Sequence, residues 1–249
     1  MIRAEVRRLA DMPAVWMTLL IAVTVPPAMT LMTSAQITRN LAGGRPGAFI
    51  DTVDLGFAEV YMLMPCAIVF GVLAVAQEFA SGPTRRGRGC ERFTVHLAIP
   101  RRIHVLTLGS LVMLGAAVVC GIALTLSYVV ARITIGVPDW GPDALIRAMS
   151  LMVTWAVFAL LASTLAWISR SVVVPVVVLV VGSSLLPLSH LLSWVTPLAR
   201  YLPDLAGSGV ALRSLAIEPL PVHVAMLTLV LWAAAAMIVS AEVVVRRDS

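Results

Sequence analysis

The sequence predicts an all-α integral membrane protein with six transmembrane helices, and three observations lead to this fold class. Of the 249 residues, 60% are hydrophobic and only 12% are charged, whereas ordinary soluble domains are roughly 45–50% apolar and 25% charged. Six runs of about 20 apolar residues are each long enough to cross the hydrocarbon core as a helix. The basic residues lie mostly at the ends of these runs and in one loop, as expected for spans oriented in a membrane.

The first element is a short helix lying on the membrane surface over residues 1–12. Ile2, Val6 and Leu9 form an apolar stripe at helical spacing, with charged residues largely beside it. The prolines at positions 26 and 27 should kink or break the first span within the bilayer. The six predicted spans are residues 14–32, 57–76, 104–131, 148–168, 172–192 and 222–244.

The chain has no linker long enough to separate domains, so residues 1–249 are predicted to form a single transmembrane domain. The orientation of this domain follows from the arginines. If the N-terminus is cytoplasmic, twelve of the eighteen basic residues fall on that side and six on the other. Because basic residues are enriched in cytoplasmic loops, both termini are expected in the cytoplasm and the protein in the cell membrane.

Several kinds of chemistry are excluded by the sequence. It contains no lysine, and a Walker A loop needs a lysine to reach the nucleotide phosphates, so the chain is not a conventional P-loop ATPase. It contains neither an HExxH nor a GxSxG motif. Its four histidines are scattered and its three cysteines show no CxxC spacing. We therefore expect no catalytic residue, no metal and no cofactor in this chain.

The net charge of +5 could suggest a nucleic-acid partner. The arginines are not interleaved with aromatic residues, however, and no soluble domain is present to form a groove. Orientation in the membrane accounts for them better, so a nucleic-acid partner is not expected.

The most informative stretch is the segment between the second and third predicted spans, residues 77–102, which we call the basic loop. It carries six arginines, each costing about 2.5–3.5 kcal/mol at the centre of a membrane helix, so the loop is expected on the cytoplasmic surface. One interpretation is that the arginines only set the orientation and contact anionic lipid head groups. The other is that the loop docks on a protein partner.

Three short motifs, in this order on six spans, resemble the ABC-2 type transporter permeases. The first is the helical segment 4–9, leading through Trp16 into the first span. The second is the basic loop, whose similarity rests on the following residues: Glu78, Gly82, Thr84, Thr94, Pro100, Arg101 and Arg102. The third is the Tyr-Leu-Pro-Asp-Leu-Ala-Gly segment 201–207 in the last predicted external loop. The basic loop differs from the family pattern by Pro83 and by an additional arginine-rich stretch, residues 85–92.

The resemblance implies that the chain is the membrane-spanning subunit of an ATP-driven exporter. ATP and Mg²⁺ would bind a separate P-loop ATPase subunit, and a second permease copy or a paralogue would complete the substrate path. The cargo would be hydrophobic or amphipathic, such as a drug, a peptide or a lipid-like molecule. Coupling to the ATPase would involve Glu78, Gly82, Thr84, Arg85, Thr94, Pro100, Arg101 and Arg102. Among these, Glu78 is the candidate hinge anchor, paired with an arginine such as Arg85 or Arg101.

Small residues inside two spans allow more than one interpretation. Ser183 and Ser184 lie in the middle of the fifth predicted span, where small residues usually serve close helix packing and sometimes contact substrate. Ala67 and Gly71 have a small-xxx-small spacing, which is common by chance in a membrane chain rich in alanine.

Two other classes of function stay open beside the exporter. An ion- or proton-coupled secondary transporter should place ionisable groups near the middle of the membrane, and the third to fifth predicted spans contain no acidic residue. Glu242 is predicted to pair locally with Arg246, four residues further on. A membrane scaffold subunit would use the same helices without a substrate path. A P-loop ATPase partner separates the exporter from both alternatives.

Overall fold

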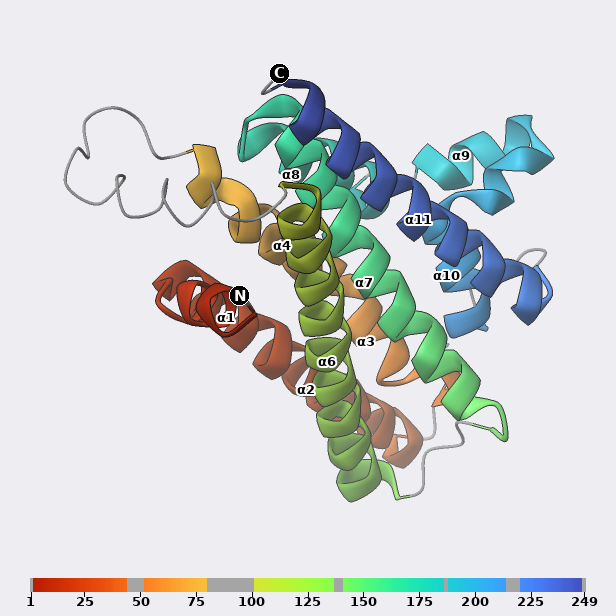
Figure 1. The fold of residues 1–249 in the computed structure, drawn as a ribbon. Helices are drawn as coiled ribbons and strands as arrows, with labels where there is room; N and C mark the ends of the chain where they lie inside the picture. The colour runs from red at the N-terminus through yellow and green to blue at the C-terminus, as the bar shows by residue number, and fades with distance from the viewer. Residues whose placement is uncertain are drawn as a thin grey trace.

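The computed structural model describes residues 2–43, 52–79, 101–136, 141–185, 188–213 and 220–247, and these ranges contain helices but no strand (Figure 1). In chain order the elements are α1 (Ile2–Ala10), α2 (Pro13–Ala42), η1 (Thr52–Asp54), α3 (Phe57–Met62), α4 (Met64–Phe79), α6 (Arg101–Ile135), α7 (Ala144–Ser169), α8 (Val173–Val180), η2 (Val181–Leu185), α9 (Leu188–Val195), η3 (Pro197–Tyr201), α10 (Pro203–Ala211) and α11 (Val222–Arg247).

Five helical stretches in the described part of the chain are long and apolar enough to cross a membrane. They are residues 13–40, 57–76, 102–135, 144–169 and 222–244. The structure therefore confirms the predicted fold class at this level: the chain is an all-helical, multi-pass membrane protein.

The first span differs from the prediction because α2 continues through its two prolines. It forms one helix of 30 residues with Pro26 and Pro27 in its interior, so of the two expected outcomes, a kink or a break, the break is wrong. A proline removes a backbone donor from the helical ladder. Hydroxyl side chains add bonds to the same ladder: Thr30 donates to the Pro26 carbonyl (2.9 Å), and Thr24 donates to the Leu20 carbonyl (2.7 Å).

α2 packs along α6, and small side chains line the α6 side of the bundle. Five residues spaced three or four positions apart are fully or nearly fully buried: Ala116, Cys120, Ala123, Ser127 and Ala131. This spacing places them on one face of the helix. Because none has a large side chain, neighbouring helices can approach this face closely, as is common in membrane helix packing.

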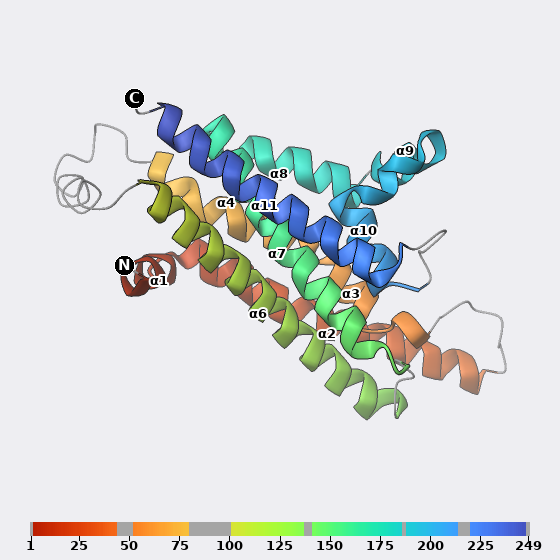
Figure 2. The same ribbon diagram turned by 45° about the vertical axis from the view of Figure 1, so that its right-hand side comes forward.

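α7 forms the centre of the bundle (Figure 2) and makes two very close contacts. A Cβ atom placed on Gly71 of α4 would lie 2.0 Å from the carbonyl oxygen of Ala159, and one on Gly207 of α10 would lie 2.0 Å from the hydroxyl of Thr154. Both glycines therefore allow a neighbouring element to approach α7 more closely than any side chain would permit. The small-xxx-small pair at Ala67 and Gly71 is thus part of a packing interface.

The fifth predicted span, residues 172–192, is not a single regular helix. α8 ends at Val180, a π-helical turn covers Val181–Leu185, and α9 begins at Leu188. Gly182, Ser183 and Ser184 fall inside this turn, where glycine and serine, both poor helix formers, weaken the regular ladder. π-helical turns of this kind often accompany functional sites.

Residues 201–207, predicted as part of an external loop, lie within η3 and α10 instead. α10 packs against α7 and α11, and the indole nitrogen of Trp232 donates to the Tyr201 carbonyl (2.9 Å). Trp232 is ten residues into α11, about 15 Å along its axis from Val222. This segment thus turns back into the bundle rather than lying outside it.

The two ends of the described chain lie at the same end of the bundle. α1 and the last turns of α11 both lie close to the beginning of α6 (Figure 2). The Arg102–Glu242 ion pair connects α6 with α11 there, and a contact between His104 and Glu5 connects α6 with α1. α7 ends near the same place, because Thr164 is hydrogen-bonded to Ser240 of α11 (2.8 Å). Residues 170–221 therefore return the chain to the opposite end, where α11 begins.

Candidate functional site

The end of the bundle formed by α1, the end of α4, the start of α6 and the end of α11 is the candidate functional site, here called the basic end. α4 ends at Phe79 and α6 begins at Arg101. The two helix ends to which the basic loop is attached therefore both belong to this end of the bundle. The arginines exposed here are Arg7, Arg102 and Arg246. The structure therefore places the two helix ends that flank this loop beside both ends of the described chain.

Most of the predicted coupling residues lie outside the described residues. These are Gly82, Thr84, Arg85, Thr94 and Pro100. The backbone of Glu78 belongs to the last turn of α4 and that of Arg101 opens α6, but their side chains are outside the description. The predicted pairing of Glu78 with Arg85 or Arg101 thus stays a prediction.

Arg102 is the predicted coupling residue whose contact is defined. Its Nη2 lies 3.1 Å from Oε1 of Glu242, 140 positions further along the chain. Arg246 also contacts Glu242, through Nε to Oε2 at 3.7 Å. The predicted local pair within α11 is therefore present, but the closer contact of Glu242 connects α11 with α6.

A second side-chain contact, between Glu5 and His104, attaches α1 to the same region. Oε1 of Glu5 lies 3.7 Å from Nδ1 of His104, and its Oε2 accepts a hydrogen bond from Nη1 of Arg8 (3.3 Å). Glu5 is buried although α1 is at the surface. The indole nitrogen of Trp16 donates to the Ala10 carbonyl (2.6 Å), which holds the beginning of α2 against the end of α1.

Sequence reasoning did not find a buried charge cluster at the opposite end of the bundle. Arg147 is 1% exposed and forms an ion pair with Asp54. It donates from Nε to the Ala211 carbonyl (2.9 Å) and from Nη1 to the Val53 carbonyl (3.0 Å). Its guanidinium carbon lies 4.2 Å from the centre of the Phe57 ring, a cation–π contact.

The same cluster continues through Arg213. The backbone nitrogen of Arg213 donates to Oδ1 of Asp54 (3.0 Å), and its guanidinium is paired with Asp143. The contacts thus join the segment before α3, the beginning of α7 and the segment after α10. A sequence signal was present, because Arg147 lies next to an apolar run, but its aspartate partner is more than 90 residues away.

A buried carboxylate also occurs beside α10. Asp204 accepts a hydrogen bond from the hydroxyl of Ser189 on α9, and its Oδ1 accepts from the backbone nitrogen of Leu205 (2.9 Å). Ser208 shares a side-chain hydrogen bond with Tyr61 of α3. Asp204 belongs to the segment singled out by resemblance, whose position inside the bundle the sequence did not reveal.

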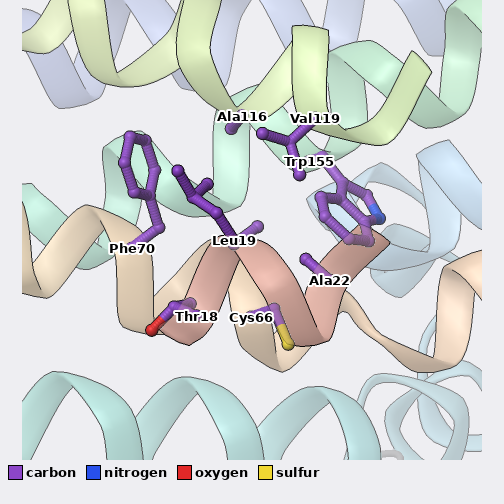
Figure 3. A pocket seen from close by; sticks show the side chains of 9 residues that line it. Thr18, Leu19, Ala22, Cys66, Phe70, Ala116, Val119 and Trp155 are labelled. Atoms are coloured by element: carbon purple, nitrogen blue, oxygen red, sulfur yellow. The ribbon is translucent and has the colours of Figure 1, made fainter. Parts of the chain in front are cut away.

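Of the two residues proposed for a substrate path, only Ser183 has a described side chain. Ser183 donates its hydroxyl to the Leu179 carbonyl of its own helix (2.6 Å), and the side chain of Ser184 lies outside the description. A very small apolar pocket, with a cavity volume of about 10 Å³, occurs between α2, α4, α6 and α7 (Figure 3). Its lining includes Leu19, Phe70 and Trp155.

Within the described residues no group of three or more histidine, cysteine, aspartate or glutamate side chains is placed to hold a metal ion. The comparisons with known proteins give no assignment either. No family model, no curated protein and no solved structure matches this chain. What the chain does must therefore be argued from its residues and its geometry.

Proposed function

We propose that this chain is the membrane-spanning permease subunit of an ATP-driven exporter of the ABC-2 type, coupled to a separate P-loop ATPase and paired with a second permease copy or a paralogue. The observation that carries the proposal is the position of the two helix ends that flank the basic loop. Its attachment points lie beside α1 and the end of α11, and Arg102 at the start of α6 is joined to Glu242. A partner docked on this loop would act on several helices together.

Six membrane crossings, with the basic end in the cytoplasm of the cell membrane, are part of this proposal. Five long apolar helices account for five crossings. α7 and α11 run in the same direction, since Thr164 and Ser240 are in contact near their C-terminal ends. The chain must therefore cross once more between them, and the segment α8, η2 and α9 supports this sixth crossing. The excess of arginines in the basic loop and near the termini supports the cytoplasmic assignment.

The absence of lysine supports a division of labour between two proteins. A chain without a Walker A lysine needs another polypeptide to bind and hydrolyse ATP. The cargo proposed is hydrophobic or amphipathic, because the bundle has extensive apolar surfaces facing outward from α2, α6, α8 and α11 and a lipid-soluble cargo can reach a path formed between such helices.

A secondary transporter stays the second candidate, and one observation favours it. Asp54, Arg147 and Asp204 are buried ionisable residues within the bundle, and such residues mark ion or proton pathways in many transporters. All three lie toward the end opposite the basic loop, and Asp54 and Arg147 compensate each other. A structural role for this pair accounts for its burial without transport.

The test is to purify the chain from its native membrane and to assay the product for ATP hydrolysis. We expect a P-loop ATPase to co-purify in a defined ratio and the chain alone to be inactive. Replacing Arg85, Arg86 and Arg88 with glutamine should reduce the amount of ATPase retained, whereas the control R200Q, at an exposed arginine outside the basic end, should not. Transport driven by an ion gradient without any ATPase would instead establish the secondary transporter.

Glu78 provides a second test of coupling. Loss of its charge would leave a partner arginine uncompensated, at a cost of about 1–3 kcal/mol, which is enough to bias a two-state switch. Glu78→Gln should therefore leave expression and ATPase binding nearly unchanged but lower transport or substrate-stimulated hydrolysis several-fold. Normal transport by this variant would show that Glu78 is only a carboxylate at the membrane interface. Failure of the variant to insert into the membrane would show that the role of Glu78 is structural.

A further inference from the structure

The ion pair between Arg102 and Glu242 is not explained by the helix on which Arg102 lies. Arg102 is the second residue of α6, and the positive end of the helix dipole disfavours a cation in the first turn. Glu242 has a basic neighbour on its own helix, Arg246, yet its shorter contact is with Arg102, at 3.1 Å against 3.7 Å. The two charges therefore compensate each other across the interface between α6 and α11.

The contribution of this pair to folding is small. The side chains of Arg102 and Glu242 are 59% and 43% exposed, and exposed ion pairs contribute little to stability. What the pair does provide is a direct contact between the last turns of α11 and the first turn of α6.

The packing just beyond the pair makes this contact effective. A Cβ atom on Gly109 would lie 2.7 Å from the sulfur of Met237, so α6 and α11 are in close contact two turns further into the bundle. Ser240 is hydrogen-bonded to Thr164 of α7. A displacement of the first turn of α6 would therefore be passed to α11 at the surface by the ion pair and within the bundle by direct contact.

We infer that Glu242 is a positioning residue that couples the basic loop to α11: through Arg102 it makes the last turns of α11 follow the first turn of α6. The inference rests on the proposed function for the source of the movement, which is the docked ATPase. The link between the two helices belongs to this chain alone and is testable without the ATPase.

The experiment measures the distance between spin labels at Ile103 on α6 and Val239 on α11, which are both exposed, in lipid nanodiscs. In the otherwise unchanged chain we expect one narrow distribution. Glu242→Gln and Arg102→Gln should each broaden it about twofold, since the ends of the two helices are then held together only by the packing at Gly109. The exchanged double variant R102E/E242R should restore the narrow distribution, and the control R246Q should leave it unchanged.

The same measurement with the ATPase and ATP bound extends the test to coupling. We expect ATP to displace both labels together in the unchanged chain and in R102E/E242R, and to displace the α11 label less than the α6 label in Glu242→Gln. If no ATPase binds, the proposed function fails, and the nanodisc distances alone decide whether the link exists. A narrow distribution in Glu242→Gln, with or without ATP, would overturn the inference.

Discussion

Arg147 shows how a single charged side chain can be buried in a membrane bundle. Its ion pair with Asp54, its bonds to two backbone carbonyls and the ring of Phe57 together surround the guanidinium. A buried charge without partners costs several kcal/mol. The contacts therefore explain why this residue is tolerated at 1% exposure, and they make the pair a place where one substitution should have a large effect.

Removing the arginine alone should destabilise the protein strongly. Arg147→Met leaves the buried carboxylate of Asp54 without its main partner, and breaking such a pair costs about 3–5 kcal/mol. Thermal unfolding in detergent should show a large decrease in Tm. The double variant D54L/R147M should recover part of it, and R213Q, which removes a guanidinium that is 44% exposed, should have little effect. An unchanged Tm in Arg147→Met would contradict this account of the cluster.

At the residue scale the sequence predicts charges better than it predicts their partners. The basic loop and Glu242 could be recognised from charge and position alone. The contact between Arg102 and Glu242 spans 140 positions, and that between Arg147 and Asp54 spans 93. Such pairs depend on how helices that are far apart in the sequence pack against each other. The spacing of residues within one helix does not indicate this packing.

The contact between α4 and α7 is the clearest feature at the scale of the elements. Gly71 lies against the backbone of Ala159, with no room for a side chain. Close approach of this kind increases dispersion contacts between membrane helices, which gain little from the hydrophobic effect once both are in lipid. The bundle therefore depends on glycine at this position.

Gly71→Ala should push α4 away from α7. Overpacking of this kind costs about 1–3 kcal/mol, and Tm in detergent should fall by several degrees. Gly182→Ala provides the matched control, because a Cβ atom there meets nothing within 4 Å, and its Tm should stay close to that of the unchanged protein. Equal effects of the two substitutions would show that the packing at Gly71 is not the cause.

The elements predicted most accurately are the long apolar ones. The predicted spans 57–76 and 222–244 coincide with the long apolar segments of the structure, while α2, α6 and α7 extend beyond their predicted ends. Hydropathy identifies the helical residues that must be apolar because they lie in the hydrocarbon core. It does not identify the helical turns that continue beyond this core. It also did not predict the π-helical turn at Val181–Leu185, or α10, which packs against α7 and α11.

At the scale of the whole molecule, the account requires six crossings with both termini on the cytoplasmic side. A cysteine introduced at Pro142, which is exposed at the end opposite the basic loop, should react with a membrane-impermeant maleimide added to intact cells. A cysteine at Ser249 should react only after the cells are opened. Labelling of Ser249 in intact cells would show that the orientation, or the number of crossings, is wrong.

The central claim is that the basic loop is the docking site of an ATPase, and crosslinking from that loop tests it most directly. A photo-crosslinking residue at Arg86, activated in native membranes and analysed by mass spectrometry, should form a product with a protein that contains a Walker A motif. The same residue at Arg200 should form none. Products with lipid alone, from a chain that still transports its cargo, would contradict the account.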